Sequence, residues 1–452
     1  MKDVFDRAFL KKISSIGLPI AAQFFITSAV NLIDVVMLGR LGEDAVAASG
    51  AVNQIFFILN LVCFGINSGA SVFLSQFWGT RDLRNVRRTV GMMYLLGLIG
   101  AVIFTVAACV IPRQLVSLYV HEPQVIKLAE DYLAIIAFTF IVSAASFALS
   151  TACRCTGNVR LPMRASFLAI LVNVVGNSLL IFGLLGFPAL GVRGAAIATA
   201  ISRAAEFLML VLTVYRHKLP PAATLRELFA FDRPFLRHYV RTTWPVLLNE
   251  TLWSVGVSLY SVAFGQLGTA ALAAVQISNT IVQLLTVFSR GFSNATGIII
   301  GNQIGAGEEE EAKHTARRIL WLMPLMGAVI CAVTIAVSPL FLLLYNVSAE
   351  TLTLAREVIV VQSAGMILKS LTMVLIVGIC RSGGDTLFAC VADVGSVWLG
   401  GVPMGFLGVW LGLPLWGVSV CVLAEEVLKI AVALPRVLSG KWVRNVAAAL
   451  QK

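Results

Sequence analysis

Long apolar stretches separated by short polar segments recur from one end of the chain to the other. The first runs from Ile13 to Gly39 and is interrupted by one carboxylate, Asp34. A helix that crosses a bilayer needs about 20 mostly apolar residues, and these stretches reach or exceed that length. The pattern therefore predicts twelve membrane-spanning helices, near residues 13–38, 46–76, 90–112, 128–151, 163–185, 190–214, 241–266, 270–302, 316–338, 352–380, 386–409 and 414–437.

The composition agrees with this pattern. Of the 452 residues, 58% are hydrophobic and only 13% are charged, and the mean hydropathy is +0.90. A soluble domain carries about 25% charged residues. We therefore expect an all-α polytopic membrane protein. We expect no cleavable signal peptide, because the first apolar stretch is too long and lacks a small-residue cleavage site.

The basic residues predict an orientation. In one set of segments, beginning with the amino terminus, there are 25 Lys and Arg residues, whereas the alternate loops hold 5. Because Lys and Arg concentrate in cytoplasmic loops, both termini are expected on the cytoplasmic side. The net charge of +11 is thereby explained by topology, and no nucleic-acid partner is expected.

The longest polar stretch, Tyr215 to Tyr239, falls in the middle of the chain and contains three prolines and mixed charge. It predicts a cytoplasmic linker between two halves of six helices each. The expected organisation is an amino-terminal lobe over 1–214, a linker over 215–239 and a carboxy-terminal lobe over 240–452.

The two halves repeat each other. An offset of 226 residues aligns their first two spans without a gap, and an offset of 227 aligns a later turn. The matched pairs include Pro19 with Pro245, Gly39 with Gly265, Asn53 with Asn279 and Arg154 with Arg381. Six spans return the chain to its starting side, so the repeats are parallel, an arrangement common in transporters that open alternately to each side.

Several chemistries have no sequence signal. There is no phosphate-binding loop, no H-E-x-x-H and no G-x-S-x-G, and no soluble region is large enough to hydrolyse ATP. With four histidines and scattered cysteines, we expect free core thiols, no metal cofactor and no enzyme activity. The cysteines are Cys63, Cys109, Cys153, Cys155, Cys331, Cys380, Cys390 and Cys421.

Asp34 is the carboxylate that needs an explanation. It lies 22 residues beyond Lys12, about 33 Å along a helix, which places it in the outer half of the amino-terminal lobe. A carboxylate inside a membrane costs several kcal/mol unless it is paired, hydrated or neutralised. Neutralisation by a proton or a bound sodium ion makes such a group a candidate for ion coupling.

Four stretches of the sequence also resemble a known family. They are NLIDVVMLGRLG, which contains Asp34, WPVLLNETLWSVG at the start of the seventh span, GNQIGAGE at the end of the eighth and CRSGGDT after the tenth. Together they resemble the multidrug and toxic compound extrusion (MATE) family over essentially the whole chain. The resemblance implies two six-helix lobes around a V-shaped cavity, and export of organic solutes in exchange for H⁺ or Na⁺.

The resemblance also implies a cation site around Asp34. Asn173 and Asn177 are four residues apart in the fifth span and so share one helix face. Family members carry polar or acidic residues at this spacing facing the aspartate of the first span, and some have Asp where this chain has Asn177. Thr199 in the sixth span is expected to complete the cluster. The alternative is that the two amides simply join helices.

Two further carboxylates lie inside spans of the second half. Glu250 is nine residues past Arg241, about 13 Å into the membrane, and Asp393 is eight past Asp385, about 12 Å in. Their similar depth predicts that spans seven and eleven bring them together. The resemblance implies a carboxy-terminal cation site at Glu250, and depth adds Asp393. The alternative is that they pair with Arg290 or Lys369.

Other charged residues inside spans have a simpler interpretation. Arg203 with Glu206, and Glu426 with Lys429, are spaced three apart and are expected to form ion pairs on one helix face. An offset of 223 superposes the two pairs with reversed signs. Asp385, beside two glycines at a cytoplasmic turn, is expected to cap a helix.

The remaining site residues are hinges and substrate contacts. Pro19 and its repeat partner Pro245 are expected hinges, because proline removes one helical hydrogen bond. Arg290, Lys369 and Gln276 are expected to face the substrate cavity. Basic groups there would repel a cationic substrate, which keeps anionic and zwitterionic substrates open.

The sequence therefore predicts a secondary antiporter of the plasma membrane. It is expected to act as a monomer and to export hydrophobic, cationic organic compounds in exchange for H⁺ or Na⁺ by alternating access. One alternative is a flippase for lipid-linked oligosaccharides, which would need a more cationic cavity. An intramembrane enzyme lacks a visible catalytic dyad, and a passive channel does not account for lone buried acids in a repeat.

Overall fold

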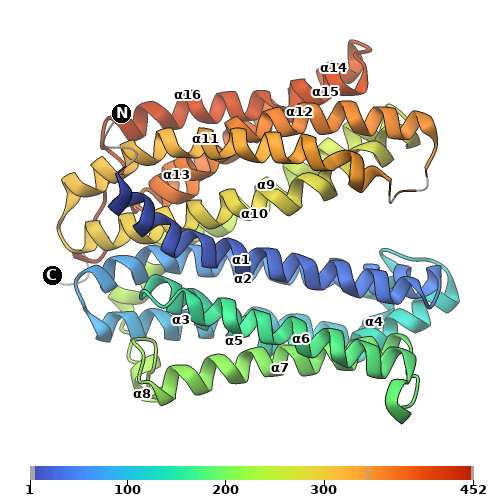
Figure 1. Cartoon of the computed structure of the whole chain (residues 1–452). Coiled ribbons are helices and arrows are strands. Elements are labelled where there is room, and N and C mark those ends of the chain that lie inside the picture. The colour runs from blue at the N-terminus through green and yellow to red at the C-terminus, as the bar shows by residue number, and fades with distance from the viewer. Residues whose placement is uncertain (1–5, 344, 346, 449–452) are drawn as a thin grey trace. The chain divides into compact units, whose positions relative to one another are not determined.

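The computed structural model describes residues 6–343, 345 and 347–448. Over these residues the chain is almost entirely helical and has no named strand, as Figure 1 shows. The first and last few residues, including Lys2 and Lys452 of the orientation count, lie outside the described part. The all-α membrane fold expected from the hydropathy pattern is confirmed.

The described part of the first half of the chain, from residue 6 onward, contains eight α-helices. They are α1 (Arg7–Gly39), α2 (Glu43–Gly79), α3 (Leu83–Val110), α4 (Pro112–Ser117), α5 (Pro123–Cys155), α6 (Arg160–Phe182), α7 (Val192–Arg216) and α8 (Leu225–Leu228), with a short 3₁₀ turn, η1 (Leu184–Gly186), after α6.

The residues described in the second half form eight more α-helices and two π-helical segments. They are α9 (Arg233–Gly265), α10 (Thr269–Gly305), α11 (Glu309–Leu342), α12 (Ala349–Met373), η2 (Val374–Arg381), α13 (Thr386–Ser396), η3 (Val397–Gly401), α14 (Val402–Trp410), α15 (Leu415–Val422) and α16 (Ala424–Leu438).

Each of the twelve predicted spans has a helix or a run of joined helices. Ten of the described helices or runs are long and apolar enough to cross a membrane, among them Ala349–Arg381 and Thr386–Trp410. The seventh span corresponds to α9, and the twelfth to α15 and α16, which meet at Leu423. The fifth span ends earlier than predicted, at Phe182, because Gly183 adopts a left-handed conformation with φ of 70°.

The internal repeat is visible in the helix lengths. Helices α1 and α9 both have 33 residues, and α2 and α10 both have 37. Both α1 and α9 continue through their matched prolines, Pro19 and Pro245. The correspondence weakens in the last three spans, where η2, η3 and the break at Leu423 interrupt helices whose counterparts in the first half are continuous.

The chain divides into two compact units. The amino-terminal unit consists of residues 23–74 and 81–236, and the carboxy-terminal unit of residues 1–22, 75–80 and 237–452. One end of α1 and one end of α2 thus belong to the carboxy-terminal unit.

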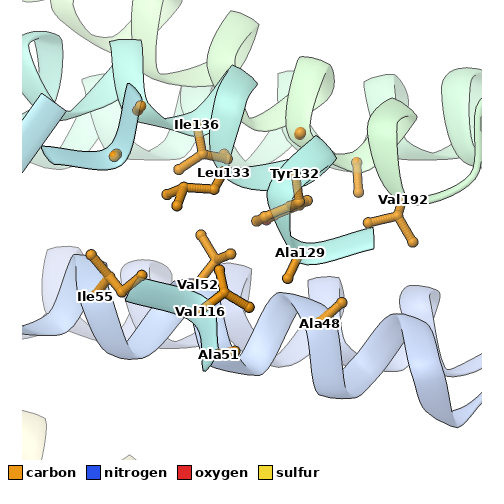
Figure 2. Packing of buried hydrophobic residues seen from close by; sticks show 14 of the residues in the cluster. Ala48, Ala51, Val52, Ile55, Val116, Ala129, Tyr132, Leu133, Ile136 and Val192 are labelled. Carbon is orange, nitrogen blue, oxygen red and sulfur yellow. The ribbon is translucent and has the colours of Figure 1, made fainter. Parts of the chain in front are cut away.

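Small residues let the helices of the amino-terminal unit approach closely. Figure 2 shows Ala48, Val52 and Ile55 of α2 in one buried cluster with Leu133 and Ile136 of α5. Lipid tails are as apolar as these side chains, so this packing is stabilised mainly by van der Waals contact between interlocking surfaces.

The end of the chain closes over one end of the carboxy-terminal unit. The buried Gln76 of α2 donates to the Arg444 carbonyl (3.1 Å) and accepts from the amide of Val446 (2.8 Å). Trp442 is completely buried nearby against Gly383. These contacts join an end of the second helix to the last described residues, which are far apart in sequence.

Candidate ion-coupling site

Asp34 lies in a polar cluster of the amino-terminal unit. Asn177 Nδ2 of α6 donates to Asp34 Oδ1 of α1 at 2.5 Å, and also to Asn173 Oδ1 at 3.2 Å. Asn173 Nδ2 in turn donates to Thr199 Oγ1 of α7 at 3.2 Å. The structure thus connects the four residues that the sequence placed in one site.

The burial of this cluster is graded. Asn173 and Asn177 are completely buried, whereas Asp34 and Thr199 are half-buried. The Asn177 Oδ1 atom has no hydrogen-bond partner among the described residues. A buried amide oxygen without a partner is costly, so this atom is available to a water molecule or a cation beside Asp34.

Close contact between α6 and α7 brings the cluster together. Gly176, next to Asn177, faces Ala198, and a Cβ atom at Gly176 would lie 2.9 Å from the Ala198 methyl group. A larger residue at either position would push the helices apart.

Two more residues join the site that sequence analysis did not include. The buried Tyr132 of α5 lies close to Thr199 and interacts electrostatically with Asp34. Arg203, one turn beyond Thr199, acts on Asp34 at longer range and forms its ion pair with Glu206, Nη1 to Oε2 at 3.1 Å. The predicted Arg203–Glu206 pair is confirmed. The sequence signal for Arg203 was its four-residue spacing from Thr199, whereas no signal pointed to Tyr132.

The carboxylates of the carboxy-terminal unit have basic partners. Glu250 Oε1 accepts from Arg381 Nη1 at 2.8 Å, and Asp393 Oδ1 is 2.9 Å from Lys429 Nζ. Asn249, adjacent to Glu250, donates to Asp393 Oδ2 at 3.0 Å, so α9 contacts α13 through Asn249 rather than through the predicted Glu250. The partners themselves were not those expected, since the sequence offered Arg290 and Lys369.

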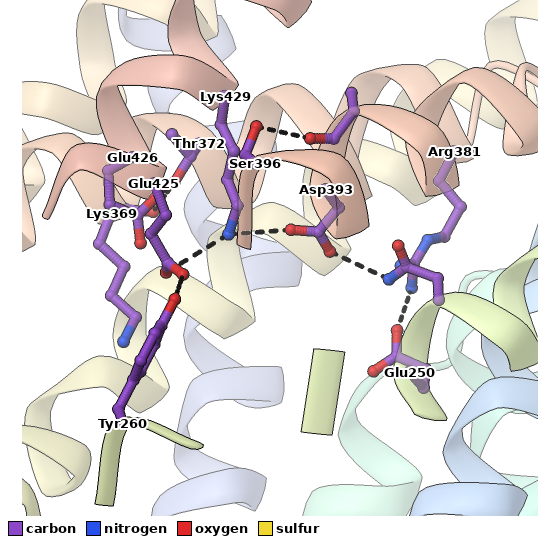
Figure 3. A network of polar contacts seen from close by, with 12 residues as sticks. Glu250, Tyr260, Lys369, Thr372, Arg381, Asp393, Ser396, Glu425, Glu426 and Lys429 are labelled. Carbon is purple, nitrogen blue, oxygen red and sulfur yellow. Dashed lines mark hydrogen bonds and ion pairs between the residues drawn. The ribbon is translucent and has the colours of Figure 1, made fainter. Parts of the chain in front are cut away.

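Figure 3 shows how this network continues along α16. Lys429 also pairs with Glu425 Oε1 at 3.5 Å, and Glu425 accepts from the Tyr260 hydroxyl. Glu426 accepts from Thr372. The predicted Glu426–Lys429 ion pair is therefore wrong, because the ammonium turns to Asp393 and Glu425.

Asp385 is also held differently from the prediction. It stands at the N-cap position of α13, but its side chain caps no backbone amide. Instead it is almost completely buried, accepts from Arg436 (Nη2 to Oδ2, 2.7 Å) and forms an ion pair with Arg444 (Nη2 to Oδ1, 2.9 Å). These contacts connect the start of α13 to α16 and to Arg444.

The three expected substrate-contact residues lie in the carboxy-terminal unit. Arg290 and Gln276 are exposed on α10, and Lys369 is half-buried on α12. Arg290 acts electrostatically on Glu250, and Lys369 acts on Glu425. Among the described residues no group of three or more His, Cys, Asp or Glu side chains is arranged to hold a metal ion.

Two copies of a six-span unit, each with ionisable groups buried among membrane-spanning helices, are typical of polytopic transporters. The MatE family model matches the chain twice, over residues 19–179 and 245–407. The chain belongs to the MatE family, the efflux transporters that its motifs resemble.

Relatives match over nearly the whole length. The probable multidrug resistance protein YoeA of Bacillus subtilis is 26% identical over 88% of both chains. The probable multidrug resistance protein NorM of Thermotoga maritima is 23% identical over 96% of this chain and 93% of its own.

Solved structures share the fold. One, described as an outward-facing conformation of a multidrug resistance MATE family transporter, has a TM-score of 0.86 at 19% identity, covering 98% of this chain and 97% of its own. Another, a transporter of Pyrococcus furiosus with a binding pocket of reverse polarity, has a TM-score of 0.86 at 20% identity, covering 95% and 96%.

Proposed function

We propose that this transporter exports hydrophobic, cationic organic compounds across the plasma membrane in exchange for H⁺ or Na⁺ by alternating access. The observation that carries the proposal is Asp34: a carboxylate in a membrane-spanning helix, held by an amide and without an ion-pair partner among the described residues. Such a group is stable when neutralised by a small cation and costly when bare.

The amino-terminal cluster is the proposed exchange site. A proton on Asp34, or a sodium ion beside it, has the free Asn177 Oδ1 atom as an additional partner. Glu250 and Asp393 contribute to coupling through their ion pairs with Arg381 and Lys429. Pro19, upstream on the same helix as Asp34, is the proposed hinge of α1, and Pro245 that of α9.

The substrate class rests on the relatives. Their names refer to multidrug resistance. The exposed Arg290 and half-buried Lys369 favour an anionic or lipid-linked substrate instead, the alternative of a flippase. The chain transports without transforming its substrate, acts as a monomer and has both termini in the cytoplasm.

The test is efflux from proteoliposomes under separately imposed gradients of H⁺ and Na⁺. We expect ethidium or a fluoroquinolone to accumulate against its gradient when one of the two ions drives it. Asp34→Asn should abolish the driven flux, because the amide carries no charge for the ion to neutralise, while purified yield and thermal unfolding stay unchanged.

Asp44→Asn is the matched control, since Asp44 is exposed in the first turn of α2. It should transport normally. Undiminished driven efflux in Asp34→Asn would remove this residue from the mechanism. Flux of a lipid-linked oligosaccharide without drug transport would favour the flippase.

A further inference from the structure

Each of the two units contains a network of buried polar side chains. The two networks occupy equivalent positions in the repeat but carry different charges. Offsets of 226 and 227 residues match Gln23 with Asn249 and Ser166 with Asp393, and an offset of 223 matches Glu206 with Lys429. The amino-terminal network thus ends on the carboxylate of Glu206, whereas its counterpart ends on the ammonium group of Lys429.

In the amino-terminal network, hydrogen bonds connect three side chains in series. Gln23 Nε2 donates to Ser166 Oγ at 3.3 Å, and Ser166 Oγ donates to Glu206 Oε1 at 2.8 Å. Glu206 is neutralised by Arg203 of the same helix. Arg154 Nη1 also donates to Gln23 Oε1 at 2.8 Å, so this network holds two positive charges and one negative charge.

In the carboxy-terminal network, the three matched residues contact one another in the same order. Asn249 Nδ2 donates to Asp393 Oδ2 at 3.0 Å, and Lys429 Nζ forms an ion pair with Asp393 Oδ1 at 2.9 Å. Lys429 also lies 3.5 Å from Glu425 Oε1. A cation therefore stands between two carboxylates that belong to different helices.

Lys429 is enclosed by oxygen atoms. Its own residue is 5% exposed, and Glu425 is 7% exposed. The Asn249 side chain, which is 1% exposed and bonded to Asp393, has an Oδ1 atom without a partner among the described residues. Tyr260 bonds the second oxygen of Glu425, as Figure 3 shows.

Irregular helices assemble this oxygen shell. The π-helical turn η3 starts at Val397, directly after the end of α13, and α16 starts after the break at Leu423, so that Glu425 lies in its first turn. Gly401 lets α9 approach, since any side chain there would meet the Tyr260 hydroxyl. Interrupted helices commonly hold the ions of secondary transporters.

The other charged groups nearby do not replace Lys429. Glu426 adds a third carboxylate, which accepts from Thr372. Lys369 acts on Glu425 from α12, and Arg381 acts on Asp393 but is paired with Glu250. Removal of the Lys429 charge would leave buried carboxylates in excess, which costs several kcal/mol unless another cation enters.

We infer that the Lys429 ammonium is a tethered cation that occupies a monovalent-cation site formed by Asp393, Glu425 and Asn249. Without the Lys429 charge, this site would bind Na⁺ or a proton. The Lys429 ammonium occupies it and so excludes both ions. A consequence, which rests on the proposed function, is that ion exchange is confined to the Asp34 cluster.

The test is cation binding to the purified protein, measured calorimetrically in buffer free of alkali metals, with Asp34→Asn in every variant. The Asp34→Asn chain should bind no sodium. Adding Lys429→Met, which keeps the length of the side chain and removes its charge, should produce saturable binding of one positive charge per chain. This charge is sodium at alkaline pH and a proton, detected as uptake, at acid pH. Lys429→Gln serves as a second variant in case the methionine variant does not fold.

Two controls separate the site from a general loss of structure. Lys429→Arg keeps the charge and should bind no sodium. Asp393→Asn combined with Lys429→Met removes both charges, and should unfold near the parent temperature without gaining a cation. Folded Lys429→Met and Lys429→Gln chains that take up neither ion, or an Asp34→Asn chain that already binds sodium, would overturn the inference. Because no transport is measured, the outcome is independent of whether Asp34 drives efflux.

Discussion

At the scale of single residues, the partner of a buried carboxylate decides what it can do. Asp34 is bonded to an amide and has no ion-pair partner among the described residues, which is why we propose it as the exchange site. Glu250 and Asp393 each face a buried basic side chain that already meets their charge. Sequence analysis found all three acids, and it found the Asn173–Asn177 face because helical spacing is local. It could not find Arg381 as the partner of Glu250, since they are 131 residues apart.

The Glu250–Arg381 pair gives a residue-scale prediction. Arg381→Met should destabilise the protein by about 3–5 kcal/mol, because it leaves a buried carboxylate unpaired. Thermal unfolding in detergent measures the loss. The double variant Glu250→Gln, Arg381→Met should recover most of it, since the carboxylate that Arg381 neutralises is removed as well.

The control pair for this experiment is Arg193–Asp131, which is 3.0 Å long and partly exposed to solvent. Arg193→Met should change stability by at most about 1 kcal/mol. If the double variant were no more stable than Arg381→Met alone, charge neutralisation would not be the role of Arg381.

At the scale of elements, the last spans depart from regular helices where charged groups gather. The π-helical segment η2 ends at Arg381, η3 follows Asp393, and the break at Leu423 precedes Glu425. Apolar periodicity predicted these spans but not their interruptions, because a π turn inserts one residue without changing composition. The linker likewise contains a short helix, α8, whose capping box of Thr224 and Glu227 went unrecognised.

The linker cap gives a prediction on pH. The amide and hydroxyl of Thr224 donate to Glu227, and Arg87 is 2.5 Å away, and these contacts lower the pKa of Glu227 below its ordinary value of about 4.3. Because the pKa is lower in the folded chain, the cap stabilises α8 above the unfolded value and is lost as pH falls through the folded one.

Hydrogen exchange of the linker peptide, corrected for the chemical exchange rate at each pH, measures this effect. Protection of α8 should decrease as the pH falls below about 4.3. Glu227→Gln should lack this pH dependence, because its side chain does not titrate. An identical decrease in both chains would assign the change to some other group.

At the scale of the whole molecule, duplication is the dominant feature. One family model matches each half, and the paired first helices have equal lengths. One end of α1 and one end of α2 belong to the carboxy-terminal unit. No local sequence pattern predicts this assignment. The orientation of this whole array in the membrane remains a prediction from the basic residues.

Reporter fusions test the orientation. Green fluorescent protein fused after Lys218, in the linker, should fluoresce, because that segment is rich in Lys and Arg and is expected in the cytoplasm. Alkaline phosphatase fused after Phe187, between the fifth and sixth spans, should be active because it folds only outside. The reverse pattern would invert the topology and place Asp34 near the cytoplasmic face.

The sequence by itself determined the class of fold, the position of each span, the repeat and the acid in the first span. These follow from composition and short-range periodicity, because lipid imposes the same requirement on every spanning segment. Only the tertiary structure decided which charges meet. Asp34 contacts Asn177, and Asp393 contacts Lys429, although the helices that carry them are distant in sequence. The electrostatic energy of each buried charge depends on contacts within a few ångström, which the order of residues does not encode.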